Sequence, residues 1–231
     1  MQTTLAERII AFNKSLNYKG ELPEGVSIMN PFKESAKALA ASSEFYKKYY
    51  SDNSQRKFII GINPGRFGGG ITGVPFTDPK RLLDKCGIKA DFEKKHEPSS
   101  EFIYKMIEAY GGVKSFYLKF YINSVSPLGF TATNDKGKEV NYNYYDRKDL
   151  LTDIMPFAVS SLKKQIALGL NTDTCYCLGT GKNFEILTKI NFEHRFFEII
   201  IPLEHPRFIK QYKAKQEDAY IEKYINAFNE K

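Results

Sequence analysis

Asn63, Asn123 and His205 each come at or just after the end of a short apolar run, and such runs predict buried strands. In a mostly parallel sheet, ligands bind where loops leave the carboxyl ends of the strands. We therefore expect these three side chains to surround one crevice. Amide and imidazole groups donate and accept hydrogen bonds, but an amide is not a base. An asparagine in such a crevice therefore orients a reacting group and does not deprotonate it.

The strands that would position these residues alternate with helices along the chain. Strands are expected at 57–62, 116–123, 174–178 and 195–201. Helices are expected near 5–12, 31–40, 79–86, 100–110, 147–168, 181–190 and 213–228. This alternation predicts an α/β fold, a three-layer α-β-α sandwich with a mostly parallel central sheet. We expect one domain over residues 1–231, in which residues 1–50 are a helical part of unclear role.

Composition narrows the classes of function. The 231 residues are 42% hydrophobic and 26% charged, which is an ordinary globular mixture. The formal net charge of +7 favours polyanionic partners, above all nucleic acid. No apolar stretch reaches the length of a membrane span, and the first ten residues lack the layout of a signal peptide. Three cysteines indicate a reducing compartment and cannot supply the four thiolates of a standard iron–sulfur cluster.

Three familiar motifs fail on inspection. Residues 68–73 fit G-x-G-x-x-G, but they neither follow a strand directly nor open a helix, so a dinucleotide fold is rejected. Residues 179–182, GTGK, lack the other residues of a phosphate-binding P-loop and fit an ordinary turn from strand to helix. Cys175 and Cys177 share one face of a strand without a histidine pattern that would complete a zinc site. We expect no cofactor and no metal.

One long stretch is more specific. Residues 61–76, GINPGRFGGGITGVPF, resemble the first signature of the single-strand-selective monofunctional uracil-DNA glycosylases, which reads G-M-N-P-G-P-F-G and then T-G-V-P-F-G with the same spacing. Two shorter stretches are similar in the same order. FYINSVSPL at 120–128 is similar to the family's strand that ends in Asn before C-P-L, and PLEHPRF at 202–208 to its L-H-P-S-P-R. The resemblance covers roughly residues 57–225.

The resemblance implies the roles of the site residues. Cleavage of the bond between base and deoxyribose leaves negative charge on the departing base, and the resemblance assigns its stabilisation at O2 to His205. Asn63 would position the attacking water. Asn123 would read O4 and N3–H of uracil, and Phe76 would stack on the flipped base. Ile62 and Gly65 would complete the base pocket.

The expected DNA contacts flank this pocket. They are Arg66, Gly68, Gly69, Arg207, Phe208 and Lys210. Either Arg207 or Phe208 would act as a wedge that fills the gap left by the extruded base. The loop after His205 departs from the family pattern, because Arg-Phe-Ile-Lys replaces Ser-Pro-Arg-Asn. Taken alone, the basic run 207–215 would be a solvated helix face, and Asn63 would simply cap a turn.

The leading hypothesis is a monofunctional DNA glycosylase that removes uracil or a related damaged base and has no lyase activity. One alternative is a glycosylase of the same fold with a base preference shifted to xanthine or hypoxanthine, because Arg66 and the Gly69-Gly70 pair depart from the family at the pocket mouth. The other is a non-catalytic nucleic-acid-binding module. We expect the partner to be DNA, with no membrane, metal or iron–sulfur cluster. The protein should be monomeric and cytoplasmic, and nucleoid-associated if bacterial.

Overall fold

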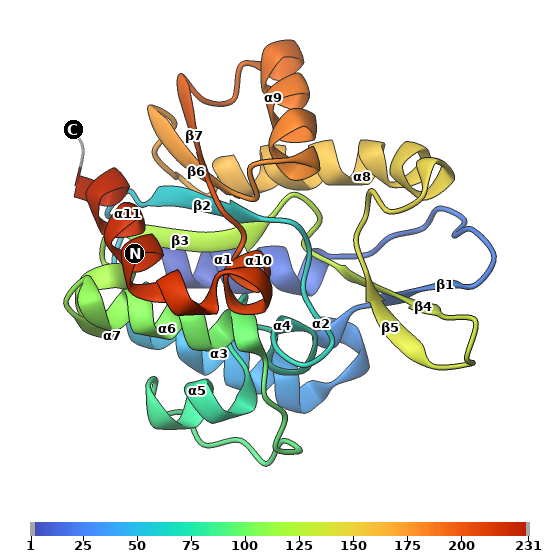
Figure 1. Ribbon diagram of the computed structural model, residues 1–231. Helices are drawn as coiled ribbons and strands as arrows, with labels where there is room; N and C mark the ends of the chain where they lie inside the picture. The colour runs from blue at the N-terminus through green and yellow to red at the C-terminus, as the bar shows by residue number, and fades with distance from the viewer. Residues whose placement is uncertain (1–2, 230–231) are drawn as a thin grey trace.

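A four-stranded parallel sheet in the order β3-β2-β6-β7 forms the centre of the molecule (Figure 1). The computed structural model describes residues 3–229. The strands are β2 (Lys57–Gly61), β3 (Phe120–Ser124), β6 (Thr174–Leu178) and β7 (Ile199–Leu203). Strands β2, β3 and β6 are apolar and buried on both faces, as is usual when helices cover both sides of a parallel sheet.

Helices pack on both faces of this sheet. The helices between residues 3 and 229 are α1 (Leu5–Ser15), α2 (Pro31–Glu34), α3 (Ala36–Tyr49), α4 (Gly69–Thr72), α5 (Pro79–Asp84), α6 (Pro98–Ala109), α7 (Gly112–Tyr117), α8 (Lys148–Ile166), α9 (Lys182–His194), α10 (Pro206–Tyr212) and α11 (Glu217–Asn229), with a short 3₁₀ turn, η1 (Ala214–Gln216). The fold is therefore the expected α/β sandwich.

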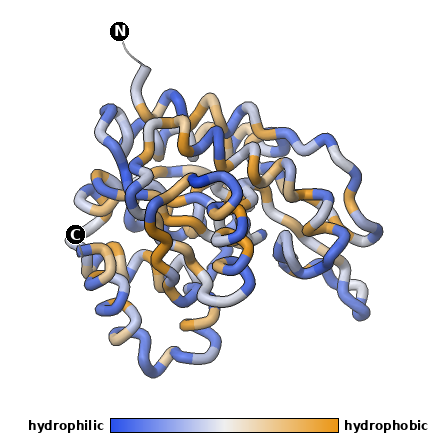
Figure 2. The backbone as a smooth tube through the Cα atoms, turned by 90° about the horizontal axis from the view of Figure 1, so that it is seen from above, coloured by the Kyte–Doolittle hydropathy of each residue, from blue (hydrophilic) through white to orange (hydrophobic). Residues whose placement is uncertain are grey.

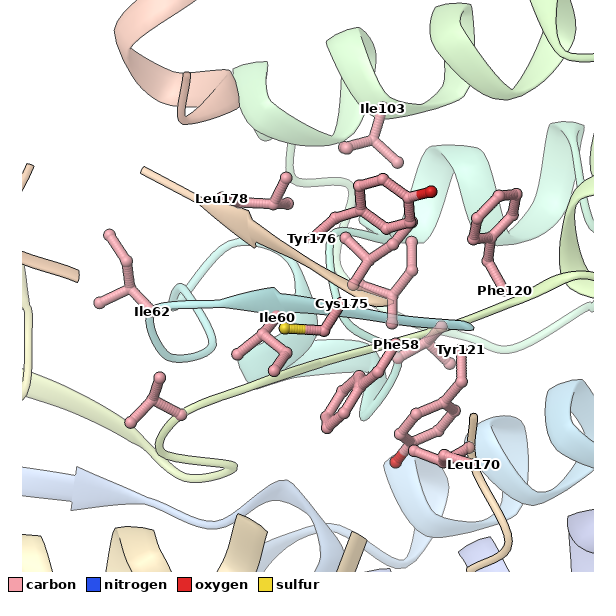
Figure 3. Packing of buried hydrophobic residues seen from close by; sticks show 14 of the residues in the cluster. Phe58, Ile60, Ile62, Ile103, Phe120, Tyr121, Leu170, Cys175, Tyr176 and Leu178 are labelled. Carbon is pink, nitrogen blue, oxygen red and sulfur yellow. The ribbon is translucent and has the colours of Figure 1, made fainter. Parts of the chain in front are cut away.

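Aromatic side chains fill the space between the layers (Figure 3). On one face, Tyr121 of β3 packs against Phe58 of β2, with ring centroids 5.3 Å apart, and against Tyr50 at the end of α3, at 6.1 Å. On the other face, Phe228 of α11 lies 4.7 Å from Phe120 and 4.8 Å from Tyr176. Figure 2 shows that apolar segments gather in the middle of the molecule and hydrophilic ones along its periphery.

A second, antiparallel sheet was not expected from the sequence. It has the order β1-β4-β5 and projects from one side of the molecule in Figure 1. Its strands are β1 (Val26–Met29), β4 (Gly129–Thr133) and β5 (Glu139–Tyr142). Each has four or five residues, and β5 is polar, so the apolar alternation that would predict a strand is weak.

Three expected boundaries were wrong. The strand expected from residue 116 begins at Phe120, because helix α7 occupies the preceding residues after a turn at Gly111, whose φ is 113°. The strand expected from residue 195 begins at Ile199, because Arg195 ends α9 in the left-handed conformation. The last helix, expected from residue 213, begins at Glu217, because the basic run after His205 forms α10 and then the turn η1.

None of the helices between residues 3 and 229 has the length and apolar character needed to cross a bilayer. Within the same residues, no group of three or more His, Cys, Asp or Glu side chains is placed to hold a metal ion.

Candidate active site

The residues singled out by the sequence come from neighbouring strands at one edge of the parallel sheet. Gly61, the last residue of β2, is paired in register with Ser124 of β3. Ile62 and Asn63 continue from β2, and Ile62 is buried with its carbonyl oxygen accepting a hydrogen bond from the Ser126 N–H. His205 follows β7, which runs parallel to β6. Parallel strands thus bring these residues to the same edge.

Phe76 and His205 face each other across this edge. Their ring centroids are 5.7 Å apart and their planes are tilted by 48°. The Phe76 ring packs against Gly61, where an added Cβ would come 2.9 Å from Phe76 Cε2 and 3.3 Å from Ser124 Oγ. Gly61 is therefore required for the ring to lie where it does, and Ser124 lies beside the same ring.

The backbone of Phe76 is held in a conformation that bulky residues avoid. Its φ is 51°, in the left-handed region, which costs an L-residue about 1–2 kcal/mol. Hydrogen bonds around Thr72 fix the turn: its hydroxyl donates to the Thr77 carbonyl at 2.7 Å and accepts from the Val74 N–H at 3.1 Å. Such strain at a fixed aromatic ring is typical of functional sites.

His205 is held as a neutral hydrogen-bond donor. It caps the N-terminus of α10, and its Nδ1 accepts a hydrogen bond from the Arg207 backbone N–H at 3.1 Å. An Nδ1 atom that accepts carries no proton, so the neutral ring carries its hydrogen on Nε2. Burial, assisted by the positive charge of Arg207, lowers the pKa of His205 to about 3. The imidazole therefore offers an Nε2–H donor at neutral pH.

The Asn63 amide is fixed by the backbone at the end of β5 and just after it. Its Nδ2 donates to the Tyr142 carbonyl at 3.1 Å, and its Oδ1 accepts from the Tyr144 N–H at 3.1 Å. A longer contact of 3.4 Å joins Nδ2 to the Pro64 carbonyl. These opposed contacts set which end of the amide is oxygen. One Oδ1 lone pair remains for a further hydrogen bond.

Asn123 lies on the other face of β3 from Ser124. It is 4% exposed, its Nδ2 donates to the Tyr121 hydroxyl at 2.7 Å, and its Oδ1 accepts from the Ser124 N–H at 2.9 Å. It lines a cavity of about 10 Å³ together with Pro64 and Pro75, the chain neighbours of Asn63 and Phe76. A cavity of that size holds one water molecule at most, so it is not a complete pocket for a base.

The glycine loop, residues 65–70, is contacted by a side chain that the sequence did not indicate. The carboxylate of Glu97, the residue before α6, lies against Gly65 and Gly68, where an added Cβ would collide with it. The Gly65 carbonyl accepts hydrogen bonds from the Gly68 and Gly70 N–H groups at 3.2 and 2.9 Å. Gly69 is buried within α4. In this structure these glycines therefore allow other parts of the chain, such as the Glu97 carboxylate, to come close to the backbone of the loop.

The predicted DNA contacts differ in solvent exposure and in whether their charges are paired with other side chains. Arg207 is exposed, and Phe208 is 41% exposed beside Tyr212 on α10. The Arg66 guanidinium lies 4.2 Å above the Phe67 ring, with Nη1 3.6 Å from Glu139 Oε2.

Lys210, by contrast, is half-buried among carboxylates. Its Nζ lies 2.9 Å from Glu101 Oε1 and 3.2 Å from Glu217 Oε1, which ties α10 to α6 and α11. Its positive charge is therefore largely balanced within the protein.

Three contributors escaped the sequence analysis: Glu97, Ser124 and the backbone of residues 142–144. Ser124 follows Asn123, so strand alternation would have placed it on the opposite face. The contacts of Asn63 with residues 142–144 involve peptide groups, which leave no trace in side-chain types. Glu97 lies in a stretch of mixed charge without a motif.

Fold and site geometry agree with the comparisons with known proteins. The sequence model of the Uracil DNA glycosylase superfamily matches residues 47–229, and the chain belongs to this superfamily. Its class is therefore that of the DNA glycosylases, hydrolases that act on DNA.

A crystal structure gives the more particular likeness. Wild-type SMUG2 from Pedobacter heparinus is 54% identical, with a TM-score of 0.96 over 98% of this chain and 97% of that chain. The family resemblance seen in the sequence is thereby confirmed, as is the α/β fold. A search of curated proteins gave no match.

Proposed function

We propose that this protein is a monofunctional glycosylase that hydrolyses the N-glycosidic bond of uracil, or of a related damaged base, in DNA. The observation that carries the proposal is the pairing of a neutral His205, whose donor is on Nε2, with the Phe76 ring at the edge where Asn63 is fixed. The family and the similarity to SMUG2 support it.

His205 would stabilise the departing base. As the glycosidic bond lengthens, negative charge gathers on the base and positive charge on the sugar. A preorganised Nε2–H donor aimed at O2 of uracil stabilises that negative charge without transferring a proton. Because the ring is already neutral and its tautomer is set by the Arg207 N–H, no rearrangement is needed in the transition state.

Asn63 would hold the water that attacks the sugar carbon. The Oδ1 atom already accepts from the Tyr144 N–H, so its remaining lone pair defines one direction from which a water can donate. The amide orients this water and does not deprotonate it. Since the nucleophile is water and no covalent intermediate forms with the protein, the reaction leaves an abasic site without strand cleavage.

Base recognition is proposed for Phe76 and Asn123, with Ile62 and Gly65 at the pocket. The Asn123 amide has one Nδ2 hydrogen not used by Tyr121 and can offer a donor to O4 and an acceptor to N3–H. The cavity it lines is too small for a pyrimidine, so the base would enter with movement of the loop around Pro64 and Pro75.

The DNA strand is proposed to lie across Arg66, Gly68 and Gly69, with Arg207 or Phe208 as the wedge. Lys210 would contribute mainly by holding α10 in place, because its charge is paired with Glu101 and Glu217. We propose that the protein acts as a monomer and in the cytoplasm.

The test is release of uracil from a labelled oligonucleotide, followed by alkaline cleavage at abasic sites. The wild type should release uracil and leave the strand intact until alkali is added. His205→Ala removes the donor to the base, and loss of one such donor lowers the rate about 10²–10³-fold. Asn63→Ala should also lose most of its activity, because the water is no longer oriented.

Both variants should keep their affinity for DNA, measured by fluorescence anisotropy. A wild type that binds uracil-containing DNA and releases no base would overturn the proposal. A panel with xanthine and hypoxanthine tests whether the base preference has shifted, and cleavage without alkali would exclude a monofunctional enzyme.

A further inference from the structure

Glu97 places a carboxyl group on the glycine loop of the site. An added Cβ at Gly65 would lie 2.5 Å from Glu97 Oε1, and one at Gly68 would lie even closer to Oε2. The carboxyl group therefore rests directly on the backbone of this loop. Asn141 Nδ2 lies near the same point, 3.8 Å from the Cβ position of Gly65.

This carboxyl group has no hydrogen-bond partner in the described chain. The Glu97 backbone N–H donates to Asp78 Oδ2 at 3.0 Å, but no donor of residues 3–229 bonds to its side-chain oxygens. Glu97 is half-buried, and a carboxylate that is partly withdrawn from water without a partner is costly. The net pKa of Glu97 is raised to about 7, chiefly by burial, while the positive charge of Arg207 lowers it and the negative charge of Asp78 raises it by smaller amounts.

The charged groups around Glu97 come from several elements. Asp78 precedes α5 and is itself paired with Arg81 at 3.0 Å and lies 3.6 Å from His96 Nδ1. Arg207 lies on α10, and its positive charge lowers the pKa of both Glu97 and His205.

The same loop carries the proposed DNA contacts Arg66, Gly68 and Gly69. A phosphodiester strand laid on this loop brings negative charge close to the Glu97 carboxyl group. Like charge disfavours the ionised carboxylate and favours the protonated acid. A protonated carboxyl group is also a hydrogen-bond donor, whereas a carboxylate can only accept.

We propose that Glu97 is a further DNA-contacting residue, whose protonated carboxyl group donates a hydrogen bond to an oxygen of the strand lying on the Gly65–Gly68 loop. The proposal rests on the glycosylase function proposed above. One proton passes from the solvent to the carboxylate as DNA binds, and no bond of the DNA changes.

The test uses an oligonucleotide containing 2′-fluoro-2′-deoxyuridine, in which the glycosidic bond resists hydrolysis. Its affinity is measured by fluorescence anisotropy between pH 6.0 and 8.5. The wild-type affinity should fall above pH 7 by up to about tenfold per pH unit, since binding takes up one proton. Glu97→Gln carries a donor at every pH and should bind tightly with no such fall. Glu97→Ala has no donor and should bind weakly throughout.

Two variants serve as controls. Glu108→Gln makes the same charge change in the last turn of α6, the helix that follows Glu97; Glu108 is paired with Lys85, and the variant should keep the wild-type profile. His96→Gln removes the neighbouring histidine and should also keep it. Thermal unfolding by circular dichroism establishes that each variant is folded.

Three results would overturn the proposal: a wild-type affinity independent of pH, a fall with pH that persists in Glu97→Gln, or Glu97→Ala binding as tightly as Glu97→Gln. The last would mean that the carboxylate only obstructs DNA. Uracil release by the wild type is measured separately. If release is seen and the binding prediction fails, the proposed glycosylase function stands without this role for Glu97.

Discussion

At the scale of single residues, the chemistry depends on atoms whose partners fix their state. The Arg207 N–H fixes the tautomer of His205, and the Tyr144 N–H fixes the amide of Asn63. Gly61 allows the Phe76 ring to lie against the sheet. Each of these side chains is thus oriented by a neighbouring group that is not itself one of the proposed catalytic groups.

The protonation state of His205 can be observed directly. Burial lowers its pKa to about 3, so the ring should remain a neutral Nε2–H tautomer from pH 8 down to pH 5. Long-range proton–nitrogen NMR of imidazole-labelled protein should show this, and only three histidines need to be assigned. His205→Gln identifies the signal. Protonation of that ring with a midpoint near pH 6.5 would contradict the structure.

Gly61→Ala tests the position of the Phe76 ring. The new methyl group would lie 2.9 Å from Cε2 and 3.0 Å from Cζ of Phe76, so the ring must shift. Misplacement of a substrate-binding group by about 1 Å can lower a rate up to about 10²-fold. We expect uracil release to fall by at least about tenfold while thermal unfolding shows a folded protein. Unchanged release would show that the ring position is unimportant.

At the scale of elements, strand β5 and helix α10 support the site from outside the parallel sheet. The end of β5 and the residues just after it contact Asn63, His205 caps α10, and Lys210 lies in the last turn of that helix. Ion pairs from Lys210 to α6 and α11 keep α10 in place. Substitutions in these two elements should therefore affect activity through position.

Asn63→Asp tests the support from β5. The aspartate would place an oxygen where Nδ2 now donates to the Tyr142 carbonyl, so two acceptors would face each other at about 3.1 Å. The loss of this hydrogen bond at a half-buried site costs about 0.5–1.5 kcal/mol in the free energy of unfolding. We expect lower stability in urea and no gain in uracil release, although aspartate is a better base.

Asn134→Asp is the matched control for that substitution. Asn134 is exposed at the tip of the β4–β5 hairpin, and its Oδ1 only accepts hydrogen bonds, from the Lys136 and Lys138 N–H groups. An aspartate can accept the same bonds, so stability should change little. Equal losses of stability in both variants would show that the hydrogen bond from Asn63 to the Tyr142 carbonyl does not contribute to stability.

The two basic residues of α10 should differ in their effect on DNA binding. Arg207→Ala removes an exposed charge, and the slope of log affinity against log salt concentration should become shallower by about 1. Lys210→Ala removes a charge already paired with Glu101 and Glu217, so that slope should change much less. Anisotropy titrations between 50 and 300 mM salt measure both. A larger effect for Lys210 would reverse this assignment.

At the scale of the whole molecule, a half-exposed ion pair between Arg56 and Asp52 lies between the N-terminal segment and the sheet. Arg56 is fully buried, and its Nη2 lies 2.8 Å from Asp52 Oδ2. The Leu5 N–H donates to the Asp52 carbonyl at 2.9 Å. The Arg56 guanidinium lowers the pKa of Asp52 to about 2.

The pH dependence of stability follows from that pair. Because the pKa of Asp52 is lower in the folded protein, the unfolded chain binds more protons, and stability rises with pH in this range. The contribution is complete above pH 4 and is lost as pH falls towards 2. Asp52→Asn should lower the free energy of unfolding by about 1–2 kcal/mol at pH 7, since Asp52 is partly solvated. Urea unfolding should show this difference shrinking at pH 3.

The sequence predicted most of the parallel sheet, because its strands are continuous apolar runs, as at Thr174–Leu178, and strand ends locate Asn63 and His205. It missed β1, β4 and β5, which have only four or five residues each and are stabilised by pairing with one another. It also missed Glu97, because only the folded chain brings residue 97 to residues 65–68. Long-range contacts of this kind leave no local pattern.

The support of Asn63 by peptide groups has a consequence for mutagenesis. Alanine scanning of Tyr142 and Tyr144 leaves their carbonyl and N–H groups in place, so it would not detect this role. A deletion or insertion between the hairpin tip and Tyr144 would shift which peptide group meets the amide, and should abolish uracil release even though no side chain of the site has changed. Chain length in this segment is therefore under tighter constraint than amino-acid identity.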